Sequence, residues 1–317
     1  MRTSLIPLAG LIPAALIAPL SAQSAGPVNV TSGTATWAEQ STPTGTRTVF
    51  TVRENSILEW PNGFNLPPGS EMVFNFASGS SVVNVVGGSG VNVIGGTVTS
   101  NGNLTFSSPH ADLVVSGSVT ANAATFATLL ADSSVLLTGA RKITFTGNPQ
   151  SSTGLLVSGS IESKTADLVL TGQRVTLGDA SVLKAKGSAL IAGGSRVELV
   201  RSLLASTLHA ASSDGFVYHL GTVSGLRIQV SAGSDVLLKG QLQALLILLE
   251  TTTGKLVKDV GALLLGDILG GLLQDGDSYA PNDSHLSTSL DVSAPDIQGS
   301  HQAETLPPGV SPSPADS

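Results

Sequence analysis

The side chains that could do chemistry are few and scattered. The five histidines show no metal-site spacing; they are His110, His209, His219, His285 and His301. Asp214, Tyr218 and His219 lie close together in the sequence and could form an acid–base group. No Arg or Lys pattern beside them would orient a substrate, so we do not expect catalysis there. The sequence therefore predicts no catalytic residue, no metal site and no cofactor.

Acidic side chains are sparse where the sequence is most regular. From Ile57 to Phe126 the acids are Glu59, Glu71 and Asp112, with no Lys or Arg. A groove that cleaves polysaccharide needs clustered carboxylates or a basic residue on one face, so that stretch cannot supply one. Charged residues later in the chain could form such a groove only if they converge on one face of the fold. These residues are Glu162, Lys164, Asp167, Arg174 and Asp179.

Two short motifs suggest calcium ligands but do not fit calcium sites. Gly87 to Gly95 resembles one calcium-binding nonapeptide with Asn in place of Asp. Such sites need tandem copies because their ligands come from consecutive turns, so we expect a turn between strands here. Asp275-Gly-Asp277 lacks the ligand spacing of an EF-hand loop.

The elements around these residues are short strands. Between Ile57 and Leu129, alternating runs are separated by Gly, Ser, Asn and Pro, and none shows the 3.6-residue spacing of a helix. The runs are Met72 to Phe76, Val82 to Val86, Val91 to Ile94, Asn103 to Phe106 and Leu113 to Val115. Asn84 shares a strand face with valines. Two orientations remain open for its side chain. It could point inward and hydrogen-bond the neighbouring turn of a stacked structure, or point outward at a bend.

A repeat becomes visible further along the chain. Short apolar runs that end in a small residue and Gly place glycines at 117, 139, 159, 172 and 193. Ala111 to Gly117 and Ala166 to Gly172 are near-copies, 55 residues apart. A period of roughly 20 residues with several short strands is that of one coil of a parallel β-helix. In such a solenoid apolar residues stack from coil to coil and bury a core that no single coil could bury.

The sequence divides into five segments. Residues 1–24 are expected to be a signal peptide, because Arg2 precedes a short apolar run with three prolines and small residues follow. Residues 25–56 are expected to cap the first coil, and 57–240 to form the solenoid. Residues 241–273 have leucines at helical spacing and predict a helical cap, and 274–317 a disordered tail. The expected fold is all-β: a right-handed parallel β-helix, the hand that crossover rules favour.

Composition limits the partners. The formal net charge is −7 and there is no basic patch, so nucleic acid is not an expected partner. The chain has no cysteine, so disulfides cannot stabilise an exported form.

An ordered series of residues resembles the N-terminal secretion domain of two-partner secretion exoproteins, the filamentous-haemagglutinin-like family. The series runs through Ile57 and Trp60, Phe64-Asn65-Leu66, Gly69, Val73 to Phe76, Ser81 to Gly88, Ile94 to Val98, and Asn101 to Phe106. The family continues with an Asn-Pro-Asn-Gly-Ile turn, where this chain has Ser108-Pro109-His110-Ala111-Asp112-Leu113. The resemblance covers Ile57 to about Leu130 well and weakly extends to Leu199.

The resemblance implies a non-catalytic protein exported through the periplasm to the cell surface or beyond. Its partner would be an outer-membrane β-barrel transporter, and a host or neighbouring-cell surface would be the target of an adhesin-like module. The residues expected to serve recognition or capping are Trp60, Phe64, Asn65, Asn84, Asn101 and Pro109. The alternative is an extracellular β-helix enzyme acting on polysaccharide.

Overall fold

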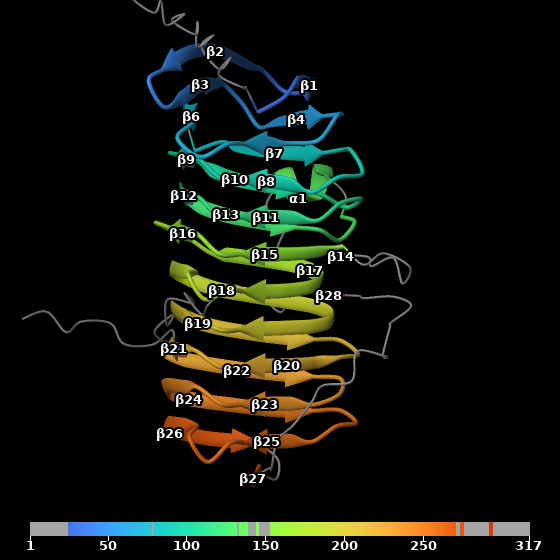
Figure 1. Cartoon of the computed structure of the whole chain (residues 1–317), viewed down its shortest axis with the longest axis vertical. Coiled ribbons are helices and arrows are strands. Elements are labelled where there is room, and N and C mark those ends of the chain that lie inside the picture. Colours follow the sequence, from blue (N-terminus) through green and yellow to red (C-terminus); the bar gives the residue numbers. More distant parts are fainter. Residues whose placement is uncertain are drawn as a thin grey trace, which may run out of the picture.

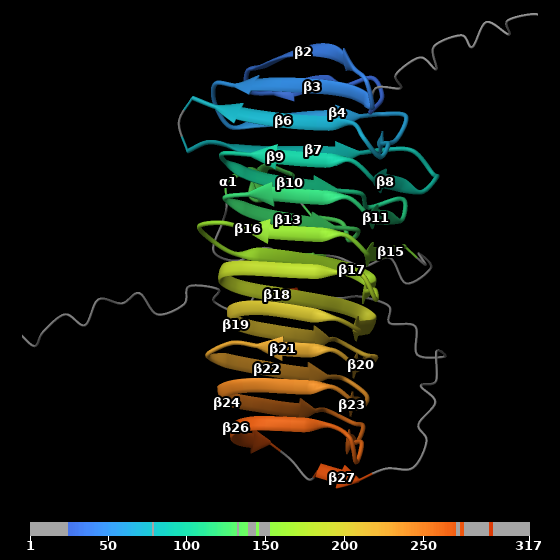
Figure 2. The same ribbon diagram turned by 60° about the vertical axis from the view of Figure 1, so that its left-hand side comes forward.

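A computed structural model describes residues 25–77, 79–131, 133–138, 144–145, 153–270, 273–275 and 292–293. Over these residues the chain winds into a parallel β-solenoid, as Figures 1 and 2 show from two sides. Twenty-six strands join in one wound sheet, and strands of successive coils pair in parallel. The predicted β-solenoid is therefore confirmed.

The wound sheet has three faces, which each coil visits in turn. The first face holds β4 (Ser56–Trp60), β7 (Ser81–Val86), β10 (Asn103–Ser107), β13 (Ala123–Ala127) and β22 (Arg227–Ala232). The second holds β5 (Asn65–Leu66), β8 (Asn92–Ile94), β11 (Leu113–Val115), β15 (Gly154–Val157), β20 (Phe216–His219), β23 (Val236–Leu238), β25 (Leu256–Lys258) and β27 (Leu273–Asp275). The third holds β3 (Gly45–Val52), β6 (Glu71–Phe76), β9 (Thr97–Ser100), β12 (Ser118–Ala121), β16 (Ser160–Ser163) and β21 (Thr222–Ser224).

Five longer strands bend around a corner and belong to two or more faces. They are β17 (Leu168–Leu177), β18 (Val182–Leu199), β19 (Ser202–Ser212), β24 (Gln241–Thr251) and β26 (Leu263–Gly270). The backbone N–H of Ser188 donates to the Asp167 side chain, 21 residues earlier, at one such corner. This separation agrees with the predicted coil period.

The N-terminal end of the stack has a different pairing. β2 (Ala35–Thr42) and β3 form an antiparallel hairpin, and β3 pairs in parallel with β6. β1 (Asn29–Ser32) pairs antiparallel with β4. Antiparallel strands thus lie over the first coil, where Figure 1 shows them at the top of the solenoid. Their pairing occupies a sheet edge that would otherwise be free.

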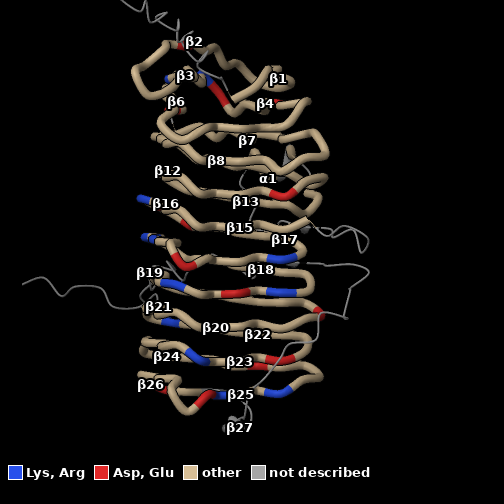
Figure 3. Tube along the Cα trace, in the orientation of Figure 1, with Lys and Arg blue, Asp and Glu red and all other residues tan. Residues whose placement is uncertain are grey.

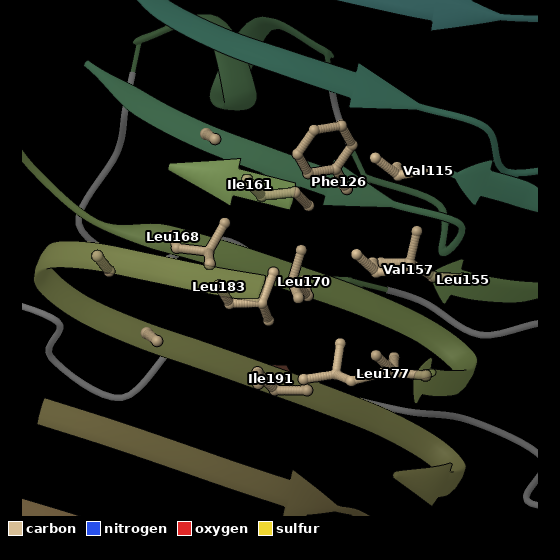
Figure 4. Close-up of a cluster of buried hydrophobic side chains, with 14 of the residues drawn as sticks. Val115, Phe126, Leu155, Val157, Ile161, Leu168, Leu170, Leu177, Leu183 and Ile191 are labelled. Atoms are coloured by element: carbon tan, nitrogen blue, oxygen red, sulfur yellow. The ribbon is translucent and has the colours of Figure 1, made fainter. Parts of the chain in front are cut away.

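The core is built from inward-facing residues that stack in register. On the first face Phe126, Leu170 and Ile191 are paired partners in successive coils, and all are fully buried. Figure 4 shows these side chains facing those of Val157 and Leu177 from the second face. Alternation along each strand places every second residue inside, and each coil covers the apolar surface of its neighbour.

A short helix packs on the outer side of the first face. α1 (Ser133–Thr138) lies against β7 and β4, and its Leu136 is buried with Val83 and Leu190, which point outward from their strands. The strand predicted just before Gly139 is therefore wrong, because Ser133–Thr138 is helical and leaves the coil path. The segment between β13 and β15 makes that coil long: Leu113 pairs with Leu155.

The helical cap predicted over 241–273 is also wrong, since β24, β25, β26 and β27 continue the solenoid. Leu242 and Leu249 fit helical spacing, but they face inward from two parts of β24 that are separated by a corner. The corner shifts the alternation, so that Leu245 is 72% exposed. Two short strands across a corner thus imitate a helical period.

The expected signal peptide at 1–24 lies outside the described residues. So does most of the expected tail at 274–317, apart from the end of β27 and from β28 (Val292–Ser293), which pairs with β14 (Thr144–Phe145). No helix in the described parts of the chain is both long and apolar enough to cross a membrane.

Candidate functional site

Large aromatic side chains fill the core of the N-terminal coils. The Trp60 and Phe64 rings meet edge to face with centroids 4.8 Å apart. Phe64 in turn contacts Phe106 at 5.2 Å, and Phe106 stacks on Phe126 at 5.8 Å. Each of these rings is at most 2% exposed. Such pairs contribute about 1 kcal/mol each beyond their buried area, so the aromatic row stiffens this end of the solenoid.

Asn84 takes the inward of the two positions left open by the sequence. It is fully buried on β7, where its in-register partners are Leu58 and Phe106. The Trp60 Nε1–H donates to its Oδ1 at 3.1 Å, and its Nδ2–H donates to the backbone oxygen of Thr105 at 3.1 Å. A buried amide is tolerated when its groups are paired, and this one ties three coils together.

A second buried amide, Asn92, joins the two turns of the motif series. Its Oδ1 accepts the backbone N–H of Phe64 at 2.8 Å, and its Nδ2–H donates to Ser108 Oγ at 2.9 Å. Ser108 Oγ–H donates to the oxygen of Ala111 at 2.9 Å, which closes the turn that contains Pro109. The turn at 108–113 is therefore held to the Phe64 turn through one side chain.

Asn65 lies beside these turns with its side chain exposed, while its backbone N–H donates to the Ala25 oxygen at 3.2 Å. An open hollow of about 250 Å³ occupies this corner. Asn65, Asn62, Phe64, Val91 and Asn92 line it together with residues 25–27. Val91 is 58% exposed, so the hollow offers an apolar contact between exposed amides.

The structure brings most of the predicted site residues together, but not all. Trp60 contacts both Phe64 and Asn84, and Asn65 lies at the adjoining hollow. Asn101 lies at another corner, after β9 on the third face. There its Oδ1 accepts the Phe76 N–H at 2.8 Å, and its backbone oxygen accepts Asn122 Nδ2–H at 2.7 Å. Pro109 is partly buried in the turn after β10.

Sequence reasoning missed Asn92 and Ser108 as site residues. Asn92 lies in the predicted strand run Val91 to Ile94 and in the motif that was interpreted as a turn between strands, and neither interpretation gave its side chain a hydrogen-bonding role. The usable signal was its alternation with Ile94, which places both side chains on the inner side of β8. An inward Asn at a coil corner indicates a side-chain amide that hydrogen-bonds the backbone groups of a neighbouring turn.

We expect Asn92→Ala to lower the free energy of unfolding by about 2 kcal/mol, because it leaves the Phe64 N–H without its acceptor. Urea unfolding followed by circular dichroism measures the change. The matched control is Asn62→Ala, since Asn62 lines the same hollow but is exposed. Equal effects of the two substitutions would show that the Asn92 bridge contributes nothing.

The charged residues that an enzyme would need do not converge. Glu162 pairs in register with Lys184 on the third face, whereas Arg174 lies on the second face beside Arg196. Asp167 sits at a corner, where burial raises the pKa of its carboxyl and the Ser188 N–H opposes that shift. Asp179 lies in the turn after β17, so these groups are spread over separate faces.

The acid–base group considered at Asp214 does not assemble. Tyr218 and His219 are neighbours on β20 and point to opposite sides, and His219 is fully buried. The Asp214 carboxylate accepts a hydrogen bond from Ser213 at 3.1 Å at the preceding corner. Within the described residues, no three His, Cys, Asp or Glu side chains gather as a metal site requires.

Comparisons with known proteins identify the fold. No protein-family model matches the chain, and no curated protein sequence matches it. Among solved structures, the chain is similar to the crystal structure of the HMW1 secretion domain from Haemophilus influenzae, with a TM-score of 0.56 and 15% identity. The match covers 74% of this chain and 76% of that one. At this identity the likeness shows a shared β-solenoid fold, which is the fold that the motif series predicts.

Proposed function

We propose that this chain is an exported exoprotein of the two-partner secretion type. Its N-terminal coils would be recognised by an outer-membrane β-barrel transporter. The observation that carries the proposal is that Trp60 of the motif series contacts Phe64 and Asn84 of the same series in the first coils of a fold shared with a secretion domain. The protein would pass through the periplasm and act, without catalysis, at the cell surface or outside as an adhesin-like module.

The surface of the N-terminal coils supports recognition through amides and backbone groups. Between Glu71 and Asp112 the chain has no Asp, Glu, Lys or Arg, and Figure 3 shows this region of the tube without charge colours. The hollow beside Asn65 presents exposed Asn side chains and the exposed Val91. A partner would bind such a surface by hydrogen bonds and apolar contact, with little dependence on salt.

The proposal predicts export that depends on a transporter. The full chain is expressed in a two-membrane bacterium with and without the transporter encoded beside it, and the medium and outer surface are assayed. We expect the protein there only when the transporter is present. Periplasmic retention in both strains would refute the export mechanism.

Asn65→Ala tests the role of the hollow. We expect export to fall about tenfold, the effect of losing one or two hydrogen bonds in recognition, with the urea midpoint unchanged because Asn65 is exposed. Asn75→Ala is the matched control, since Asn75 is an exposed amide on β6 of the third face. Equal export from both variants would show that the hollow is not part of the recognition surface.

A further inference from the structure

On the second face, one inward-pointing side chain of each described coil stacks on the equivalent side chain of the next coil and forms a column. Between Leu66 and Leu238 every described member of this column but one is aliphatic. Its members pair in register from coil to coil: Leu66, Ile94, Val115, Val157, Leu177, Leu199, His219 and Leu238. The His219 ring thus lies between the side-chain positions of Leu199 and Leu238. An aliphatic side chain would fit the pattern of this column, so the imidazole is an exception to the packing rule.

The core around His219 offers no polar partner. The side chain is fully buried, and neither ring nitrogen has a hydrogen-bond partner. On the packed strands, Glu198 of β18 and Lys239 after β23 flank the column, and Lys239 lies over the outward Tyr218 ring. Lys258 follows Leu238 in the same column. Among the described residues no Asp, Glu, Lys or Arg is fully buried, so no carboxylate in the core faces this imidazole.

The same coil carries a second, partly buried imidazole on its outer side. His209 of β19 pairs in register with Leu190 and Gln229. Its Nε2 lies 3.4 Å from Ser231 Oγ, and its Nδ1 has no partner. Burial lowers the pKa of His209; the Glu250 carboxylate opposes this shift, and the Arg227 charge adds to it.

We propose that the coil formed by β19 and β20 is an acid-sensitive break point, at which proton uptake by His219 opens the C-terminal coils. The imidazolium would lie in an apolar column without a counter-charge, whereas in the opened coil water solvates it. Each coil of a solenoid contacts only its neighbours, so the loss of one coil separates those beyond it from the N-terminal coils.

The direction of the pH effect follows from proton binding. Burial lowers the pKa of His219 from 6.5 to about 4. Above pH 6.5 the ring is neutral in the closed and the opened coil, and the full stability is present. As the pH falls from 6.5 towards 4 the opened coil binds a proton that the closed coil does not, so stability is lost. His219 alone would raise the equilibrium constant for opening about 20-fold between pH 7 and pH 5.

Hydrogen exchange of the full chain at pH 7 and pH 5, corrected for intrinsic exchange rates, tests the proposal. We expect peptides from β19 to β25 to lose about 20-fold in protection at pH 5, while peptides from β6 to β10 keep theirs. In His219→Leu, which restores the aliphatic column, this loss should fall to the part that His209 contributes, and in the double variant His219→Leu/His209→Gln it should disappear. The same acid-dependent loss in His219→Leu would overturn the proposal.

A measurement on the unaltered protein keeps the test independent of any variant. The His219 ring resonances, followed by NMR from pH 7.5 to pH 5, should not titrate in the folded state. A folded-state titration midpoint near 6.5 would show that the ring reaches water without opening of the coil, and would refute the proposal. His209→Gln, which matches Gln229 of the next coil, should leave the His219-dependent loss of protection in place.

Discussion

Trp60→Ala is expected to lower the free energy of unfolding by about 4 kcal/mol, the largest effect of any single substitution considered. The substitution removes an indole that is 1% exposed and contacts the Phe50 and Phe64 rings. It also leaves Oδ1 of the buried Asn84 without its donor. Urea unfolding followed by circular dichroism measures the loss.

Two variants separate the packing of Trp60 from its hydrogen bond. Trp60→Phe keeps most of the ring volume but removes the N–H, so we expect a loss of about 1–2 kcal/mol. Trp37→Ala is the matched control, because Trp37 is 43% exposed, although its ring also contacts that of Phe50. A Trp60→Ala effect no larger than that of Trp37→Ala would contradict this account of the N-terminal core.

Gly159→Ala is expected to lower the free energy of unfolding by about 3 kcal/mol, the upper range of overpacking. Gly159 stacks on Gly117, which stacks on Gly96, where three successive coils turn from the second to the third face. A Cβ on Gly159 would lie 2.0 Å from the backbone oxygen of Gly117, so the coils would have to separate. Thermal unfolding of the purified variant measures the effect.

The next coil supplies the control for the glycine stack. A Cβ on Gly178 would meet the Val157 oxygen at 3.6 Å, an ordinary contact, so Gly178→Ala should change stability by less than about 0.5 kcal/mol. Similar losses for Gly159→Ala and Gly178→Ala would mean that coil spacing at this corner is not set by backbone approach.

Local rules predicted the regular part of the fold. Alternation identified the strands from Met72 to Val115, because in a pleated strand every second side chain points into the core, as in β6 and β11. The repeat of glycines was informative where they occupy equivalent corners, as Gly172 and Gly193 do in paired strands. Trp60, Phe64 and Asn84 could be assigned to one region because their order in the chain places them in adjacent coils.

Rules that assume equal coils failed where the coils differ. Ala111 to Gly117 and Ala166 to Gly172 are near-copies, yet Leu113 lies on the second face and Leu168 on the first. The insertion that contains α1 lengthens one coil without moving the following strands to another face, since Leu113 still pairs with Leu155. The 55 residues between the near-copies are not a whole number of 21-residue coils, and a sequence period alone cannot show on which face a strand lies. Asn92 was missed for a related reason, since its partners at Phe64 and Ser108 come from neighbouring coils.

The placement of the large aromatic rings makes the two ends of the solenoid differ in their resistance to mechanical unfolding. Among the residues that the structure describes, the six bulkiest fully buried side chains are Trp60, Phe50, Phe64, Phe74, Phe106 and Phe126, all in the N-terminal coils. Later inward positions are smaller, such as Ala210 and Val230 in paired strands. Under tension applied to both ends, the coils would peel one at a time from the C-terminal side, and the aromatic end would yield last, at the highest force.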